Sequence, residues 1–344
     1  MADRIALLVL GMHRSGTSAM ARACSLRGAA LPRRVLPAGL GNASGHWEPE
    51  AAVALHDRVL AAAGSAVNGL DGPAEGWFAS AAAAAFRAPM RALIEQDFGD
   101  APLFVFKDPR SALVFPLWRD VLAELGIGCR PLVMLRHPAE VAQSLVARQA
   151  QAAPGQSWSL ERAGLLWLRY MLAAERHSRG MTRAFCRYAD LLADGRGTTD
   201  RLAAALGFDW PRPLAEAAPD LDAFLDPAQR HELVTTAAAE RGGVWSAWIA
   251  PCCQALDAAK PDQEPDAAVL DAIQRGFGDA CATTLPVTEA PPSKRAMPAA
   301  RPLARPAGGR RLGLVVTAAM LETEHRPWLS AILAAEAEII LIPM

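Results

Sequence analysis

The chain has 344 residues, more than one average domain needs, and a composition of 52% hydrophobic and 21% charged residues excludes a disordered or fibrous protein. Its formal net charge of −1 argues against a bulk polyanion such as nucleic acid as the partner. Positive charge is instead local, because six Arg but only one Asp fall within the first 36 residues. We therefore expect a focused anion-binding site near the N-terminus.

The six cysteines show neither a CxxC pair nor the spacing of a zinc site, and a chain of this size does not depend on disulfide bonds. The histidines also lack metal-ligand spacing, so we expect no metal site. No apolar run approaches the roughly 18 residues that a membrane-spanning helix needs. We expect a cytoplasmic protein without a signal peptide or a transmembrane segment.

The first element is predicted to be a strand. Ile5–Leu10 is a continuous apolar run closed by Gly11, as expected of a central parallel strand that is buried on both faces. A helix is predicted over Thr17–Arg27, with Gly28 placed to end it. The segment between them is therefore a turn that leads from a strand into a helix.

Two later segments repeat the order of strand, polar turn and helix. Leu103–Phe106 precedes the sequence KDPR, and Pro131–Leu135 precedes a helix that begins near Pro138. This alternation predicts an α/β fold in which a central parallel sheet is flanked by helices, in the three-layer architecture of P-loop-like proteins. Three further segments have helical composition, the second with Ser80 placed to cap it: Ala51–Ala62, Ala81–Gln96 and Leu160–Arg176.

The C-terminal part of the sequence differs in composition. Residues 285–311 contain six Pro and six basic residues but no aromatic residue, which predicts a flexible linker. Beyond it, residues 312–344 have the pattern of a short β-α-β segment, with strands expected at 313–316 and 338–342. This segment either packs on the main domain, which we place at 1–284, or begins an additional, incomplete domain after residue 311.

The sequence GMHRSGTS, Gly11–Ser18, is the strongest functional signal. Backbone N–H groups of a Gly-containing turn and of a helix N-terminus bind anions, so a phosphate-like ligand is expected. The spacing of Gly11 and Gly16 imitates an ATP-binding P-loop, but Thr17 stands where that motif requires Lys. An ordinary NTPase is therefore disfavoured, and Arg14 is positioned to supply the positive charge instead.

Several motifs in this order resemble sulfotransferases that use PAPS (3′-phosphoadenosine 5′-phosphosulfate), of the bacterial type. GMHRSGTS resembles the loop for the 5′-phosphosulfate, and the resemblance implies Arg14 as its catalytic basic residue. LRHPAEVAQSL resembles the motif for the 3′-phosphate, which implies Arg136 and Ser144. FCRYADLL implies that Tyr188 lies near the adenine. The residues that the resemblance assigns to nucleotide binding are Gly11, His13, Arg14, Ser15, Gly16, Thr17, Ser18, Arg136, Ser144 and Tyr188.

Three more motifs belong to the same resemblance. FKDPR and NASGHWE resemble segments of the bacterial branch, at residues 106–110 and 42–48. FLDPAQRH, at 224–231, resembles a later one, whose Arg230 and His231 are candidates to close over the nucleotide. The implied reaction is in-line transfer of a sulfuryl group from PAPS to a hydroxyl of a carbohydrate, lipid or small molecule, with PAP (adenosine 3′,5′-bisphosphate) as the product.

Such a transfer needs fixed positive charge and a general base. Lys107, after a strand, is the second cationic candidate beside Arg14. Glu48 is our first candidate for the base, with Asp108 and His46 as alternatives. Each has a purely structural alternative: Glu48 as a cap for the following helix, Asp108 as a partner that orients Arg110, and His46 as an exposed side chain.

Two other functions stay open from the sequence. One is a small-metabolite or nucleotide kinase with a degenerate P-loop, against which Thr17 argues. The other is a noncatalytic module that binds PAP or PAPS within a larger modifying enzyme. Binding to nucleic acid is disfavoured, because no basic stripe interleaved with aromatic residues occurs outside the linker.

Overall fold

The computed structural model describes residues 4–37, 45–74, 76–153, 158–225, 243–259 and 264–284, together with two short strands at 314–316 and 339–341. The chain divides into two compact units, Met1–Pro286 and Val287–Met344. The described elements of the first unit are β1 Ile5–Leu10, α1 Thr17–Leu26, α2 Glu50–Ala62, η1 Trp77–Ala79, α3 Ala81–Ala84, α4 Arg87–Phe98, β2 Leu103–Lys107, α5 Ser111–Glu124, β3 Gly128–Leu135, α6 Pro138–Ala152, α7 Leu160–Ser178, β4 Ala184–Arg187, α8 Tyr188–Ala193, α9 Gly195–Leu206, α10 Leu214–Phe224, η3 Trp245–Ile249, α11 Ala250–Asp257 and α12 Ala267–Thr284.

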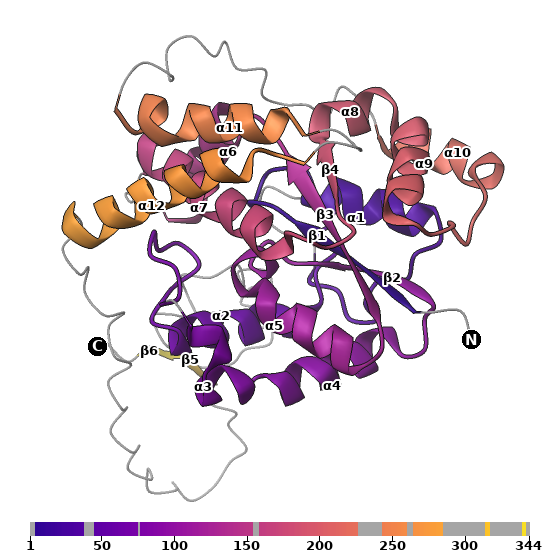
Figure 1. The fold of residues 1–344 in the computed structure, drawn as a ribbon. Helices are drawn as coiled ribbons and strands as arrows, with labels where there is room; N and C mark the ends of the chain where they lie inside the picture. The colour runs from indigo at the N-terminus through magenta and orange to yellow at the C-terminus, as the bar shows by residue number, and fades with distance from the viewer. Residues whose placement is uncertain are drawn as a thin grey trace, which may run out of the picture. The chain divides into compact units, whose positions relative to one another are not determined.

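A four-stranded parallel sheet in the order β2-β1-β3-β4 forms the centre of this unit. In the register, Leu7 of β1 lies opposite Val105 of β2 on one side and Arg130 of β3 on the other. Each connection between successive strands of this sheet contains at least one helix (Figure 1), as parallel pairing requires. The carboxyl ends of all four strands therefore meet at one edge, where ligands of open α/β sheets bind.

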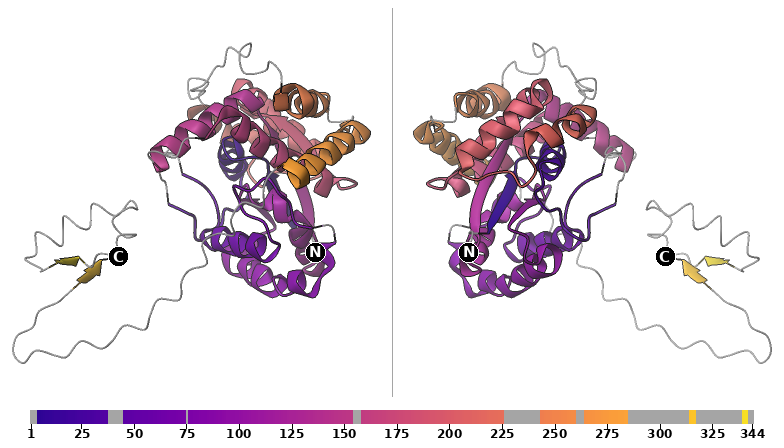
Figure 2. Two further views of the ribbon diagram at one scale, coloured as in Figure 1. Left: turned by 90° about the vertical axis from the view of Figure 1, so that its left-hand side faces the viewer. Right: turned by 90° about the vertical axis from the view of Figure 1, so that its right-hand side faces the viewer.

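Helices cover both faces of the sheet (Figures 1 and 2). Leu8 and Leu10 of β1 point into one apolar core, and Leu7 and Val9 point into the other, because successive side chains of a strand face opposite sides. The first core is completed by helices α2, α4, α5, α6, α7, α11 and α12. The second is completed by helices α1, α8, α9 and α10. The predicted three-layer α/β fold is confirmed.

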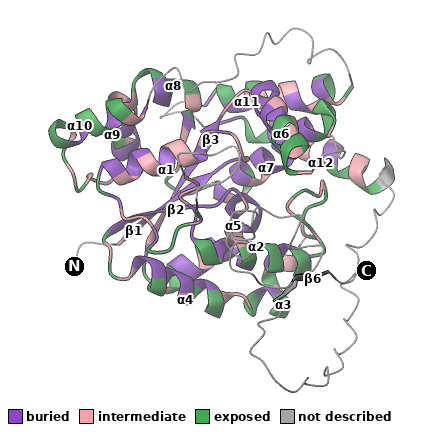
Figure 3. Ribbon diagram, turned by 180° about the vertical axis from the view of Figure 1, so that it is seen from behind, coloured by how far each residue is buried: buried purple, intermediate pink, exposed green. Residues whose placement is uncertain are grey.

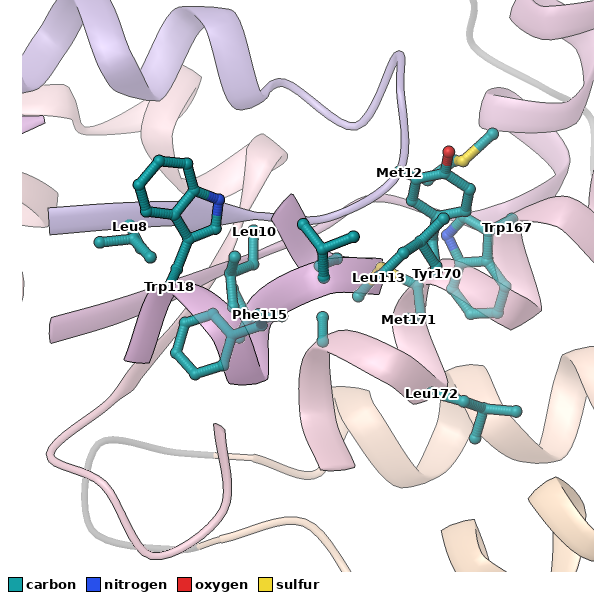
Figure 4. Close-up of a cluster of buried hydrophobic side chains, with 14 of the residues drawn as sticks. Leu8, Leu10, Met12, Leu113, Phe115, Trp118, Trp167, Tyr170, Met171 and Leu172 are labelled. Carbon is teal, nitrogen blue, oxygen red and sulfur yellow. The ribbon is translucent and has the colours of Figure 1, made fainter. Parts of the chain in front are cut away.

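The first core contains the large aromatic side chains. Trp118 and Phe115 of α5 lie beside Leu8 and Leu10 of β1, and Trp167 and Tyr170 of α7 lie around Met12 just after the strand (Figure 4). All of these side chains are at most 1% exposed. Helices that line the sheet show buried inner and exposed outer faces (Figure 3).

The first helix begins and ends where the sequence indicates. α1 starts at Thr17, directly after Gly16, and Gly28 follows its end with a φ of 95°. The left-handed region that Gly28 occupies is accessible to glycine at little cost, which explains why the helix stops here.

The helix expected over Ala81–Gln96 is wrong as a single element. Ser80 caps its start, since its Oγ accepts a hydrogen bond from the N–H of Ala83 at 3.2 Å. The helix then breaks after Ala84 and restarts as α4 at Arg87. Pro89 explains the break: inside a continuous helix its ring clashes with a carbonyl one turn back, whereas in the first turn of α4 its missing N–H costs nothing.

The second unit contains two described strands, β5 Leu314–Val316 and β6 Ile339–Leu341, which pair in parallel. Both lie within the segments in which strands are expected. The helix expected between them and the linker expected at 285–311 fall outside the described residues, so the proposed domain limits stay predictions.

The cysteines and the lengths of the helices bear on two of the expectations from the sequence. All six cysteines are free thiols, and burial raises the pKa of Cys129 and Cys186 to about 12. Among the described helices, none combines the length and the apolar character needed to cross a membrane.

Candidate functional site

The loop from β1 to α1 forms a cradle at the carboxyl edge of the sheet. Gly11, Arg14 and Gly16 all have positive φ, of 140°, 70° and 87°. No side chain caps α1 at Gly16, so the first N–H groups of the helix are available to an anion. Ser15 is fully buried, and its Oγ has no hydrogen-bond partner among the described residues. A buried hydroxyl of this kind is suited to a ligand oxygen.

The two arginines of the separate anion motifs meet at this loop. Arg14 donates from Nε to Oγ of Ser144 on α6 at 2.7 Å. Arg136, at the end of β3, donates from Nη1 to the backbone oxygen of Arg14 at 2.8 Å. It also donates from Nε to Oε2 of Glu140 at 2.9 Å. The carboxyl end of β3 and the start of α6 therefore lie directly against the loop.

Tyr188, which directly follows β4, packs against the same loop. The guanidinium of Arg136 lies 5.1 Å from the centre of its ring. A Cβ on Gly16 would lie 2.3 Å from Cδ2 of that ring, which real Cβ atoms do not tolerate. Glycine is thus required at position 16 by close approach as well as by φ.

A cavity of about 140 Å³ opens between the ends of β3 and β4. It is lined by Leu135, Arg136, His137, Glu140, Arg187, Tyr188, Ala189 and Asp257. The predicted residues Arg136 and Tyr188 therefore belong both to the cluster around the loop and to this cavity.

Lys107, the last residue of β2, joins the loop to the segment before α2. Its Nζ donates to Oε1 of Glu48 at 2.6 Å, to the backbone oxygen of His46 at 3.0 Å and to Oγ of Ser18 at 2.9 Å. Lys107 is 2% exposed and Glu48 is 4% exposed. The structure thus places the predicted second cation and the first candidate for the base in direct contact.

The backbone around Glu48 is fixed from both sides. The N–H of Leu36 donates to its carbonyl oxygen at 2.8 Å, and Trp47 before it has a φ of 56°. Trp47 and Arg14 are the non-glycine residues with positive φ in the described part of the chain, and both flank the site. Such strained conformations concentrate at functional sites. Pro49, not Glu48, occupies the capping position of α2, so the structural alternative for Glu48 is wrong.

Burial governs the ionisation of Glu48. Removal from water raises its pKa above the ordinary value of 4.5, and the charge of Lys107 opposes this shift without cancelling it. A carboxylate with a raised pKa is a better proton acceptor near neutral pH than an exposed one.

Asp108 is engaged differently. Its Oδ2 lies 2.8 Å from Nδ1 of His56, and its Oδ1 accepts hydrogen bonds from the backbone N–H and Nη1 of Arg110. Nε1 of Trp118 donates to Nε2 of His56 at 2.7 Å, so the proton of His56 is on Nδ1 and points at the carboxylate.

Burial alone would raise the pKa of Asp108, but His56 and Arg110 together hold it below its ordinary value. Asp108 is therefore a weaker candidate for the base than Glu48, and the expected pairing with Arg110 is present. Sequence reasoning missed His56, because nothing in its helical context indicates a partner 52 residues away.

His46 and His13 stay neutral at physiological pH, because their pKa values are lowered. Burial, followed by the charges of Lys107, Arg148 and Arg14, lowers the pKa of His46 to about 4. Burial also lowers the pKa of His13 well below its ordinary value, with Arg110 as the next cause. His46 is half-buried and not exposed, which corrects its structural alternative.

Asn42, Arg230 and His231 lie outside the described residues. Within the described residues, no group of three or more His, Cys, Asp or Glu side chains is arranged to hold a metal ion.

The fold and the site together define an α/β protein with an arginine-containing glycine loop at the carboxyl edge of a parallel sheet. No protein-family model matches the chain, and no curated protein sequence matches it. Among solved structures, the chain is similar to the sulfotransferase domain from the Synechococcus PCC 7002 olefin synthase, at 16% identity and a TM-score of 0.36, covering 83% of this chain and 98% of that one.

The chain is also similar to the sulfotransferase domain from the curacin biosynthetic pathway, at 15% identity and a TM-score of 0.38, covering 83% of this chain and 99% of that one. Likeness at this level carries no inference about activity, so the function proposed for this chain rests on the residues of its site.

Proposed function

We propose that the protein is a PAPS-dependent sulfotransferase of the bacterial type, acting on a hydroxyl of a carbohydrate, lipid or small molecule. The observation that carries the proposal is the contact between the two anion motifs. Arg136 binds the backbone of Arg14, 122 residues earlier in the chain, and Arg14 binds Ser144. One nucleotide with two anionic groups is therefore able to contact both motifs at once.

The chemistry of the site fits such a nucleotide. The buried Oγ of Ser15 lacks a partner among the described residues, and the N-terminus of α1 has no side-chain cap. We assign the 5′ end of the nucleotide to the loop Gly11–Ser18, including His13, Thr17 and Ser18, and the 3′-phosphate to Arg136 and Ser144, with Tyr188 near the adenine. When bound, PAPS supplies the activated sulfuryl group.

The chain's own residues then have separate roles. Arg14 and Lys107 provide fixed positive charge where negative charge grows on the leaving oxygen, which is the main requirement of this class of transfer. Glu48 takes the proton of the acceptor hydroxyl, because its raised pKa suits a base. Its position beside Lys107 keeps the base and the cation together at the reacting end of the site.

Calorimetry with PAP tests the proposal. We expect wild type to bind PAP, and Arg14→Ala combined with Arg136→Ala to lose at least about 100-fold in affinity, since each charge-assisted contact contributes about 1.5–3 kcal/mol. Arg91→Ala is the matched control, because Arg91 of α4 forms an exposed ion pair with Glu124 of α5 and not with a residue of the site. Absence of heat with wild type, or an unchanged affinity in the double variant, refutes the proposal.

Two arms of the same experiment separate the alternatives. Tighter binding of ATP with magnesium than of PAP favours a kinase with a degenerate P-loop. Tight binding of PAP without sulfate transfer from PAPS to any acceptor favours a noncatalytic module. Transfer that Glu48→Gln abolishes while PAP affinity is kept supports the assigned role of the base.

A further inference from the structure

One side of α6 carries three polar residues at intervals of four: Glu140, Ser144 and Arg148. Residues four apart lie on the same face of a helix, displaced by about 6 Å along its axis. Glu140 binds Arg136, and Ser144 binds Arg14 one turn later. Arg148 is on the next turn, so it lies beyond Arg14 on the side away from Arg136.

The place of Arg148 follows from the geometry of α6. It comes one helical turn after Ser144, which binds Arg14, so its guanidinium lies near the reacting end of the site, where the acceptor must enter if Glu48 takes its proton. The lowered pKa values of His13 and His46 agree with this placement: burial is the largest cause of both, and the charge of Arg148 adds to it in each case. His46 is also the residue whose backbone oxygen binds Lys107.

Arg148 differs from the other cations of the site, because those bind carboxylates of the protein itself. Arg110 binds Asp57 and Asp108, and Lys107 binds Glu48. Arg148 is exposed, and none of the hydrogen bonds or ion pairs found among the described residues involves it. Burial is the largest cause of the lowered pKa of His46, and the charged groups that add to it, Lys107, Arg148 and Arg14, are all cations.

We propose that Arg148 binds a negatively charged group on the acceptor, and that the acceptors are therefore acidic hydroxyl compounds. This inference rests on the proposed sulfotransferase function and names the substrate class of the same site. A guanidinium pairs with a carboxylate, phosphate or sulfate through two parallel hydrogen bonds, which fixes orientation as well as affinity. The hydroxyl of such a compound is then directed toward Glu48.

The test uses pairs of acceptors with the same hydroxyls, in which one member carries an anionic group where the other carries a neutral one: glucuronic acid with glucuronamide, glycerol 3-phosphate with 3-methoxypropane-1,2-diol, and 4-hydroxybenzoate with 4-hydroxybenzamide. Sulfate transfer from PAPS is measured for the full chain. We expect kcat/KM to favour the acidic member of at least one pair by about tenfold or more, which corresponds to a single charge-assisted contact. The pair that responds identifies whether a carboxylate or a phosphate is bound.

Variants then connect the preference to Arg148. Arg148→Gln is expected to remove the preference by raising KM for the acidic member, and Arg148→Lys to restore part of it. Arg275→Gln is the matched control, because Arg275 is also an exposed helical arginine, on α12. Calorimetry with PAP on each variant shows whether the donor site is intact.

Three results overturn this inference while PAP still binds: no transfer to any acidic member, equal or better use of the neutral members, or a preference that Arg148→Gln leaves unchanged. Failure of wild type to bind PAP is a different result, because it overturns the proposed function itself.

Discussion

Replacing Lys107 by Met tests the ion pair that connects β2 with the segment before α2. The substitution keeps most of the apolar stem but removes the charge. It deletes three contacts of Nζ, of which the one to Glu48 at 2.6 Å is the shortest. Both partners are at most 4% exposed, so the carboxylate of Glu48 is left buried without its cation.

The expected loss follows from this burial. Breaking a buried pair by removing one partner costs about 3–5 kcal/mol. Part of the loss is avoided when Glu48 takes up a proton, which limits the cost to about 1.4 kcal/mol for each pH unit above its ordinary pKa of 4.5. We therefore expect a loss of about 3 kcal/mol near neutral pH, which lowers the thermal midpoint by about 10 °C in a domain of this size.

The dependence on pH has a defined sign. Glu48 has a pKa above its ordinary 4.5 in the folded protein, so the folded state binds more protons than the unfolded state and stability decreases as pH rises above that value. Without Lys107 the pKa rises further, and the decrease continues to higher pH. The deficit of Lys107→Met is thus largest near neutral pH and becomes smaller near pH 5.

Thermal unfolding followed by circular dichroism at several pH values measures the effect. Lys107→Met combined with Glu48→Met is expected to regain at least half of the lost stability, because a pair of apolar side chains leaves no buried charge. Arg91→Met, at the exposed pair with Glu124, serves as the control and is expected to change little. A deficit that is equal at all pH values, or a double variant no more stable than Lys107→Met, refutes the reasoning.

Two further predictions concern the loop and the buried aspartate. Gly16→Ala is expected to abolish measurable PAP binding in calorimetry, because the new Cβ meets the ring of Tyr188. Gly64→Ala, at a similar φ but in open space, is the control and is expected to leave the PAP affinity unchanged. Equal PAP affinities in the two variants contradict the clash. His56→Leu removes a hydrogen-bond donor from the buried carboxylate of Asp108, and we expect a loss of about 3 kcal/mol in denaturant unfolding at neutral pH. Because the pKa of Asp108 is lowered in the folded protein, this loss is fully present above the ordinary pKa of 3.8 and becomes smaller as pH falls below it; a loss that grows in acid rules out the assigned pairing.

Much of the site lies where local sequence patterns indicate. A continuous apolar run followed by a Gly-containing turn is enough to predict a buried strand that leads through a tight loop into a helix, as β1, the loop Gly11–Ser18 and α1 show. Parallel strands present their carboxyl ends at one edge. Arg136 and Lys107, which end two of these strands, were therefore expected near the loop, and they contact it.

Other features had no signal in the sequence. β4 is a strand of four residues, too short for an alternating pattern to distinguish it from a loop. The break in the Ala-rich region depended on Pro89, whose effect was outweighed in the prediction by the high helix propensity of alanine. Arg148 showed no motif, and only its place one turn after Ser144, combined with the contact of Ser144 to Arg14, indicates a role.

The amino-acid sequence alone determined the order of strands and helices, the α/β class and the glycine-containing loop after the first strand, because each depends on residues that are close together in the chain. The tertiary structure alone decided the partners: Glu48 with Lys107, 59 residues apart, and Arg14 with Ser144, 130 residues apart. Side-chain partners are selected by how distant segments pack in three dimensions, and hydrophobic periodicity carries no information about which polar groups that packing brings together.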